Sequence, residues 1–321
     1  MISRRRFMTT AAVTGAALAA SPRLYAAAGT DVALAPLAAD EALITVLHTN
    51  DVHSQIDPLP ANDRNAGKGG VARRATLIRR VRAENPNTLL LDAGDAFQGT
   101  PYFNLYKGEA EFKAMSLLGY DAMTLGNHDF DNGVDGLVAA MKFATFPFVS
   151  ANYDMRGATA LESKVKPYIT RELAGVRVGI FGLGIQLEGL NAAGSFRGVR
   201  YQDPVGVSRE IVQTLRDRER CALVLCLSHL GYYPEPKPGQ IGDTQLAAAV
   251  DGIDFIASAH THTFMKQPVV ARTPSGAETI VFQVGKSGIN LGRVDFRVRR
   301  GAVSSWQGGT IAVQPPRLFN V

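Results

Sequence analysis

The chain has little cysteine and no long apolar run. Its 321 residues include only two cysteines, Cys221 and Cys226, which lie in or beside one apolar run at residues 222–227. On a single strand this spacing would place them on opposite faces and about 16 Å apart, beyond disulfide reach, so we expect two core residues. No apolar run reaches the roughly 20 residues that a membrane-spanning helix needs. The sequence therefore predicts neither a disulfide scaffold nor an integral membrane protein.

The main part of the chain also lacks an excess of positive charge, although the formal net charge is +5. Arg4, Arg5, Arg6 and Arg23 fall within the first 28 residues, which contain no acidic residue. The rest carries 30 Lys and Arg against 29 Asp and Glu. Because the basic character belongs to the N-terminal segment, we predict no nucleic-acid polymer as a partner.

Residues 1–28 resemble a twin-arginine signal peptide. Three arginines and Phe7 precede a weakly apolar run over residues 9–20, and a small-residue cleavage region follows at 26–28. The alternative is an amphipathic helix of the mature fold, but the run is rich in Ala and Thr and has no polar face. The resemblance implies recognition by the twin-arginine export machinery, a periplasmic or secreted location and no membrane anchor. Residues 29–41 would form a flexible lead-in.

From residue 42 the pattern alternates between apolar strands and amphipathic helices. Strands are predicted over residues 43–47, 88–91, 122–125, 146–150, 176–183, 222–228 and 253–258, and helices over 71–84, 109–118, 134–141, 205–218 and 243–250. Residues 269–313 hold only strand-like runs, which would extend the sheet or form a second one. This alternation predicts an α/β domain with helices on both faces of a sheet. No repeat or linker divides it, so we predict a single domain over residues 42–313 and a tail over 314–321.

Eleven residues that can bind a metal or transfer a proton follow the ends of predicted strands. They include five of the six histidines and fall in five places: Asp51 and His53; Asp92 and Asp95; Asn127, His128, Asp129 and Asp131; His229; and His260 and His262. The carboxyl ends of parallel strands share one edge of a sheet, so we expect these places to converge. His260 and His262 would share a face if that chain segment is extended. Singly, each motif is also compatible with a turn, a helix cap or a core histidine. Together they predict one site.

The candidate ligands combine Asp, Asn and His and include no thiolate, which favours Mn, Zn, Fe, Co or Ni. Seven of them are too many for one tetrahedral ion but suit two divalent ions that share a carboxylate: Asp51, His53, Asp95, Asn127, His229, His260 and His262. Two ions about 3.5–4 Å apart are suited to displacement at phosphorus. A serine hydrolase is disfavoured because there is no Gly-x-Ser-x-Gly, and a zinc peptidase because there is no His-Glu-x-x-His.

These motifs resemble those of the calcineurin-like metallophosphoesterases, and residues 47–53, 92–100 and 127–132 resemble the 5′-nucleotidase branch. The resemblance covers about residues 43–300 and implies a four-layer αββα sandwich. It implies that Asp51, His53 and His262 hold one metal, that Asn127, His229 and His260 hold the other, and that Asp95 bridges them. A hydroxide between the ions would attack phosphorus. His128 would stabilise or protonate the leaving group and Asp131 would orient it, with Asp129 as the alternative for that role.

Two departures from the family pattern affect these expectations. Ser258 and Ala259 stand where the family usually has glycines. Members of this branch also carry a second, C-terminal domain that holds the nucleoside, whereas this sequence reaches Val321 soon after the metal motifs. The resemblance therefore implies an exported phosphatase that acts on phosphomonoesters, with nucleotides as the expected substrates. The alternatives are a phosphodiesterase acting on 2′,3′-cyclic nucleotides, a sulfur-ester hydrolase, or a binding subunit that is inactive or depends on another chain for the specificity domain.

Further residues near the motifs have two interpretations each. Some aromatic side chains could stack on a substrate or pack in the core: Phe97, Tyr102, Phe103, Tyr232 and Tyr233. Asn191, Ser195 and Arg197 lie in a predicted loop and are candidate phosphate contacts.

Overall fold

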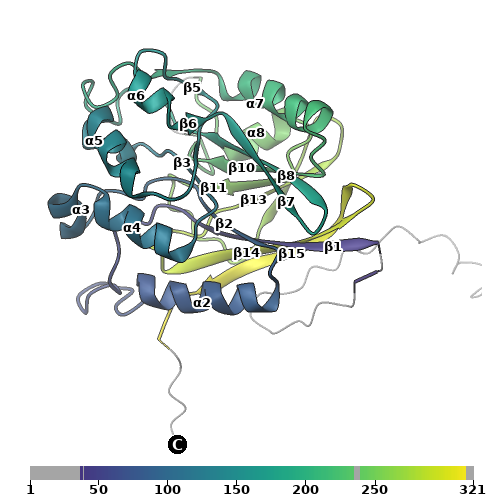
Figure 1. The fold of residues 1–321 in the computed structure, drawn as a ribbon, viewed down its shortest axis with the longest axis horizontal. Coiled ribbons are helices and arrows are strands. Elements are labelled where there is room, and N and C mark those ends of the chain that lie inside the picture. Colours follow the sequence, from purple (N-terminus) through teal and green to yellow (C-terminus); the bar gives the residue numbers. More distant parts are fainter. Residues whose placement is uncertain (1–36, 39, 235–238, 316–321) are drawn as a thin grey trace, which may run out of the picture.

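The computed structural model describes residues 37–38, 40–234 and 239–315 (Figure 1). The predicted signal peptide, residues 1–28, lies outside the described residues, as do most of the lead-in and residues 316–321 of the tail. Within the described part of the chain, no helix combines the length and apolar character needed to span a membrane.

Two sheets form the centre of the molecule. The larger has seven strands in the order β15-β14-β1-β2-β3-β4-β6. Its strands are β1 (Glu41–Thr49), β2 (Thr88–Asp92), β3 (Ala122–Thr124), β4 (Phe148–Val149), β6 (Val165–Lys166), β14 (Asn290–Arg299) and β15 (Ala302–Ala312). β1, β2, β3, β4 and β6 run parallel, and β14 and β15 add an antiparallel edge beside β1. The strand-rich C-terminal region therefore contributes to both sheets, as the two sequence expectations had it: residues 290–312 extend this sheet, and the strands within residues 269–282 belong to the second one.

The second sheet has six strands in the order β12-β13-β11-β10-β8-β7. They are β7 (Tyr168–Leu173), β8 (Val176–Leu183), β10 (Leu223–Ser228), β11 (Phe255–Ser258), β12 (Val269–Arg272) and β13 (Glu278–Phe282). Its central strands β8, β10, β11 and β13 are parallel. A separate antiparallel pair joins β5 (Tyr153–Asp154) to β9 (Arg200–Tyr201).

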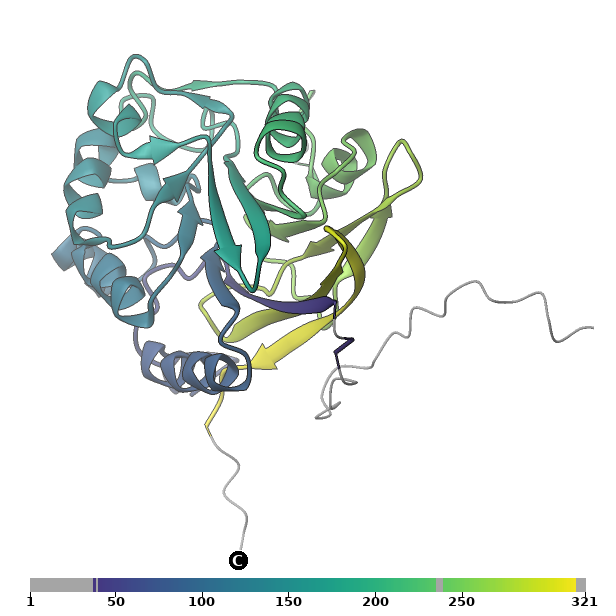
Figure 2. The same ribbon diagram turned by 45° about the vertical axis from the view of Figure 1, so that its right-hand side comes forward.

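Helices cover the outer face of each sheet (Figures 1 and 2). One group lies over the seven-stranded sheet: α2 (Val71–Glu84), α3 (Pro101–Tyr106), α4 (Glu109–Leu118), α5 (Gly133–Ala140) and α6 (Thr159–Glu162). The other sheet is covered by α7 (Pro204–Gln213), which continues as a π-helical segment η3 (Thr214–Arg218), and by α8 (Asp243–Ala249). Short 3₁₀ turns η1 (His128–Phe130) and η2 (Met141–Phe143) flank α5.

Side-chain alternation along the strands shows the layers directly. In β2, Leu89 and Leu91 point into the core between the two sheets, while Leu90 packs against the helices. In β10, Leu225 faces the other sheet while Cys226 faces α8. Since both faces of these strands are buried, their sequences are continuously apolar. The structure confirms the four-layer αββα class. The pattern-based expectation of helices on both faces of one sheet was wrong, because a second sheet covers the inner face.

The predicted boundaries of α2, α4 and β8 are confirmed to the residue. The sequence analysis did not identify α3 or β7. The expectation for the cysteines is half confirmed: Cys221 and Cys226 are both buried free thiols. They do not lie on opposite faces, because β10 begins only at Leu223 and the chain before it turns both thiols into the core beneath α7 and α8.

Candidate metal centre

Strand ends from both sheets supply the predicted site. Asp51 follows β1, Asp95 follows β2 and Asn127 follows β3, all in the larger sheet. His229 and His260 follow β10 and β11 of the other sheet. The two sheets pack with these carboxyl ends on the same side, so segments that are 200 residues apart in sequence meet there. The predicted convergence is confirmed.

Most of the candidate ligands have an unusual backbone. Asp51, His53, Asp95, His260 and His262 all have positive φ, between 48° and 68°. Non-glycine residues seldom adopt this conformation, Asp and His tolerate it better than most, and strain of this kind is concentrated at functional sites. The extended segment expected for His260 and His262 was therefore wrong: the chain turns between them, and their rings belong to different groups of ligands.

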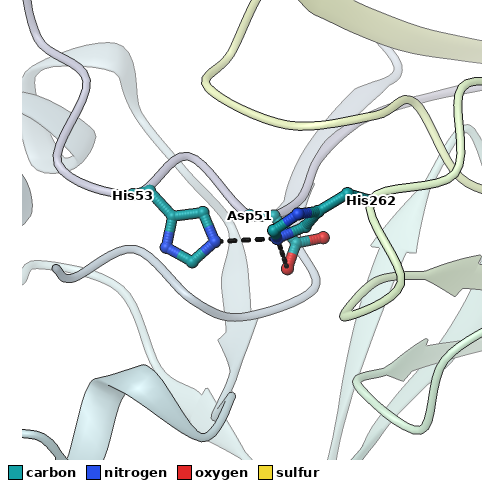
Figure 3. Close-up of side chains that lie close together, drawn as sticks. All are labelled: Asp51, His53 and His262. Carbon is teal, nitrogen blue, oxygen red and sulfur yellow. Dashed lines mark hydrogen bonds and ion pairs between the residues drawn. The ribbon is translucent and has the colours of Figure 1, made fainter. Parts of the chain in front are cut away.

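The first group consists of Asp51, His53 and His262, whose ligand atoms all lie within 4.8 Å of one another (Figure 3). Nε2 of His53 is 2.9 Å from Nε2 of His262, and the latter is 3.6 Å from Oδ1 of Asp51. These distances are short enough for the three side chains to bind one ion. The other ring nitrogen of His53 lies 3.2 Å from the carbonyl oxygen of Phe97, which fixes the ring.

The second group consists of Asp95, His229 and His260, also within 4.8 Å of one another. Nε2 of His229 is fully buried and makes no hydrogen bond, although Oδ2 of Asp95 is 3.1 Å away. Its Nδ1 lies 2.8 Å from the carbonyl oxygen of Ala93, so the free nitrogen faces the site. Oδ1 of Asn127 lies 3.0 Å from Nδ1 of His260, which places this amide in the same group.

Backbone contacts between the loops leave no room for side chains at two glycines. A Cβ on Gly94 would lie 2.6 Å from the nitrogen of Gly126, and one on Gly126 would overlap the Asp95 carboxylate. Asp129 joins the same two loops, because its buried carboxylate accepts hydrogen bonds from the N–H groups of Asp95 (3.0 Å) and Gly126 (2.8 Å). Asp129, the alternative partner of His128 in the sequence analysis, is thus engaged elsewhere.

The site attracts positive charge. Burial would lower the pKa of His229, but the carboxylates of Asp95 and Asp51 outweigh it and raise the pKa to about 10. Burial raises the pKa of Asp51 to about 7. Burial, helped by His53 and Lys286, lowers the pKa of His262 to about 3, so this imidazole stays neutral and keeps a lone pair. A divalent cation would satisfy both carboxylates and Nε2 of His229, so the residues present fit a metal centre.

His128 lies at the edge of the first group. Its ring centre is 5.3 Å from that of His53, and its Nδ1 is 2.8 Å from Oδ2 of Asp131. This hydrogen bond raises the pKa of His128. The backbone N–H of His128 also donates to Oδ1 of Asp95 at 2.8 Å, which holds His128 beside the candidate ligands. The structure therefore brings His128 and Asp131 together as expected.

Several supporting residues were missed by the sequence analysis. Asn50 donates to Oδ2 of Asp51 at 2.7 Å and to the carbonyl oxygen of Gly285 at 2.6 Å. Gln283 donates to the hydroxyl of Ser258 at 2.9 Å, so the serine in place of the usual glycine has a partner. Asn50 lies within the motif at residues 47–53, but nothing in the pattern around Gln283 distinguishes it from an ordinary strand residue.

The other candidates separate into packing and exposed residues. Phe97 and Phe103 are buried and stack with ring centres 5.2 Å apart, so they pack in the core. Asp92 accepts a hydrogen bond from Thr49 at 2.6 Å and is not among the candidate ligands. The remaining residues have other partners or are exposed. The Tyr102 hydroxyl donates to Asp57, the Tyr232 ring packs on Tyr233, and the Ser195 hydroxyl donates to the carbonyl oxygen of Ala192. Tyr233 and Arg197 are exposed.

Comparison with known proteins agrees with this geometry. The family model for the calcineurin-like phosphoesterases matches residues 44–264. The chain is 32% identical over 303 residues to the trifunctional nucleotide phosphoesterase protein YfkN of Bacillus subtilis, covering 85% of this chain and 19% of that protein. It is 34% identical over 287 residues to the 5′-nucleotidase of Rattus norvegicus, covering 82% of this chain and 48% of the relative.

A solved structure has the same fold. The 5′-nucleotidase precursor of Thermus thermophilus superposes with a TM-score of 0.76 at 33% sequence identity, covering 85% of this chain and 55% of that one. The chain thus spans about half the length of these 5′-nucleotidases, and a smaller share of the Bacillus relative.

Proposed function

Because the chain belongs to the calcineurin-like phosphoesterase family, whose members are metal-dependent phosphoester hydrolases, we propose that it is an exported two-metal phosphatase. Its proposed substrates are phosphomonoesters, nucleotides among them. The observation that carries the proposal is the convergence of two groups of candidate ligands beside the His128–Asp131 pair. The 5′-nucleotidases among the relatives support a nucleotide substrate.

The ligand atoms divide the site into two halves. Asp51, His53 and His262 would hold one ion, Asn127, His229 and His260 the other, and Asp95 would contribute to both. When bound, two divalent ions would supply Lewis acidity at the phosphoryl oxygens and lower the pKa of a water molecule at the site.

The chain's own residues would complete the reaction at the leaving group. Asp131 accepts the Nδ1 proton of His128 in a hydrogen bond, which favours the protonated ring and fixes its orientation. The other ring nitrogen, Nε2, can then give its proton to the departing oxygen. Replacing His128 with Asn should lower kcat by about 10²–10⁴, typical of the loss of a general acid, with no loss of metal.

The activity is tested on the purified chain reconstituted with Mn²⁺, Zn²⁺ or Co²⁺. The substrates are a nucleoside 5′-monophosphate, a 2′,3′-cyclic nucleotide, bis-p-nitrophenyl phosphate and a sulfate ester, and the Asp95→Ala variant is the control. We expect hydrolysis of the monophosphate by the wild type and none by the control. If no substrate is hydrolysed with two ions bound, the chain is a binding subunit or requires a second chain, and the proposal is wrong.

A diester substrate is the second candidate. It is favoured by the relative described as a trifunctional nucleotide phosphoesterase, because that name is not restricted to monoesters. Faster turnover of the cyclic nucleotide or of bis-p-nitrophenyl phosphate than of the monophosphate would select it.

Export is the third part of the proposal. The support is the sequence of residues 1–28, with Arg4, Arg5 and Arg6 before an apolar run. We propose that the mature protein is periplasmic or secreted. Replacing the three arginines with lysine should leave unprocessed protein inside the cell, and mass spectrometry of the exported wild type should show cleavage near residue 28. Unchanged export of the lysine variant would refute this part alone.

A further inference from the structure

Asn191 lies outside the motifs of the candidate site but contacts two residues of the motif at residues 127–132. It lies in the loop between β8 and β9, where its side-chain Nδ2 donates to the carbonyl oxygen of Asn127 at 2.8 Å and to Oδ1 of Asp131 at 3.2 Å. One amide group therefore contacts both a candidate ligand of the second ion and the partner of His128. The sequence analysis had considered Asn191 only as a candidate phosphate contact.

The loop that carries Asn191 is firmly held. Its own N–H donates to the carbonyl oxygen of Leu187 at 3.0 Å, and the Leu187 side chain is buried in the core under the helices. Where the loop begins, Asn152 donates to the carbonyl oxygen of Gly184 at 2.7 Å and accepts from its N–H at 2.8 Å. Asn191 can thus hold the side chain of Asp131 in one orientation.

The carboxylate of Asp131 would rotate easily without a second hydrogen-bond partner. Its side chain is 27% exposed, it directly follows the short turn η1, and the terminal torsion of an aspartate rotates easily. Oδ2 contacts Nδ1 of His128 at 2.8 Å, while Oδ1 has Asn191 as its hydrogen-bond partner. With Oδ1 held, the carboxylate plane is set and Oδ2 stays on the histidine ring.

We propose that Asn191 is a positioning residue that acts through Asp131 on His128. The role rests on the proposed phosphoester hydrolysis. Asn191 need not touch the substrate. It keeps the carboxylate in the orientation that holds the His128 ring ready to donate its Nε2 proton. The effect of a positioning residue on the rate is largest for a substrate with a poor leaving group, because the departing oxygen must then be protonated as its bond to phosphorus breaks.

The test compares two leaving groups in the Asn191→Leu variant, which keeps the size of the side chain but removes the donor. A nucleoside 5′-monophosphate releases a poor alkoxide, whereas p-nitrophenyl phosphate releases a phenolate that needs little protonation. We expect kcat for the nucleotide to fall about tenfold, a part of the 10²–10⁴ that a general acid supplies, and kcat for p-nitrophenyl phosphate to change less than about twofold. Metal content should not change. Ser195→Ala, in the same loop, is the matched control, because the Ser195 hydroxyl donates to the carbonyl oxygen of Ala192 and not to Asp131 or Asn127 within the described residues.

A spectroscopic readout separates this role from the activity itself. The proton between Nδ1 of His128 and Asp131 should give a downfield ¹H signal, assigned by its loss in Asp131→Asn. We expect it to weaken or disappear in Asn191→Leu and to persist in Ser195→Ala. Equal loss of activity on both esters, loss of metal, or an unchanged signal with unchanged kinetics would overturn the positioning role. A wild type that shows the signal but hydrolyses neither ester would overturn the proposed function, and the catalytic role of Asn191 with it.

Discussion

Nδ1 of His128 lies 2.8 Å from Oδ2 of Asp131, three residues further along the chain. The 3₁₀ turn η1 brings the two side chains onto the same side, and Asp129 between them turns inward to the loop of Asp95. Two acidic residues in one short motif therefore have different tasks. Asp131 contacts the ring of His128 at the edge of the site, and Asp129 accepts hydrogen bonds from the backbone beneath it.

Replacing Asp131 with Asn tests the first task. The amide keeps the shape of the side chain but removes the charge that favours a protonated ring. We expect kcat for a nucleoside monophosphate to fall about 10²-fold, with two ions still bound. Steady-state kinetics and elemental analysis of the same preparation check this. Full activity with metal bound would show that the pair has no part in the reaction.

Replacing Gly126 with Ala tests the close approach of the loops. The new Cβ would overlap the Asp95 carboxylate, so the loops must separate. We expect a loss of about 1–3 kcal/mol in the free energy of unfolding and weaker metal binding. Urea denaturation and metal titration measure both. Gly194→Ala is the control, because a Cβ there meets no atom within 4 Å. Equal effects of the two substitutions would contradict the packing described.

His48 makes stability depend on pH without involving the metal ligands. Its ring is fully buried between Phe255 and Phe282, and both ring nitrogens lack a hydrogen-bond partner within the described structure. Burial lowers its pKa to about 3, whereas an unfolded histidine titrates near 6.5. Between these values the unfolded chain binds more protons. The free energy of unfolding therefore falls as the pH falls, by up to about 1.4 kcal/mol per unit from this group, and the contribution is constant above about pH 6.5.

The variant His48→Leu should remove this dependence. Relative to the wild type, it should gain about 2 kcal/mol in the free energy of unfolding when the pH is lowered from 7 to 5. Urea denaturation of both proteins in the same metal-free buffers gives the difference directly. A difference that does not vary with pH would mean that His48 can be protonated in the folded protein.

Removing the metals should destabilise the fold. Asp51 and Asp95 are almost completely buried, and without a cation the imidazoles around them, chiefly His229, are the groups that compensate their charge. Adding Mn²⁺ at about 100 times its dissociation constant should raise the free energy of unfolding by about 2.7 kcal/mol per site. Thermal unfolding with and without chelator measures this, and Asp95→Ala should show no metal-dependent shift. The same shift in that variant would place the ions elsewhere.

Many of the helices and strands could be predicted from the sequence, because side chains that are buried at regular intervals give a regular pattern of apolar residues. α2 and α4 each bury one stripe of a regular pattern, and their limits were found to the residue. The packing of a second sheet on the first could not be predicted, because a strand buried under helices and a strand buried under another sheet have the same apolar sequence. Strand β7, which is only partly buried, has no strong pattern of its own.

The candidate ligands could be predicted from their residue types and from their order along the chain, but their detailed geometry could not. The ligands follow strand ends, which topology brings together. The turn between His260 and His262 could not be predicted, because it depends on backbone conformations that Asp and His adopt only under tertiary constraint. The role of Asn191 depends on two hydrogen bonds across 60 residues or more. No local pattern specifies such contacts.

The central claim is that two cations lie together at the shared edge of the two sheets. Crystals of the full chain grown with Mn²⁺ and measured at the manganese absorption edge test it most directly. We predict two anomalous peaks about 3.5–4 Å apart, one against Asp51, His53 and His262 and the other against Asn127, His229 and His260, with Asp95 between them. A single peak, or peaks away from these side chains, would contradict the claim.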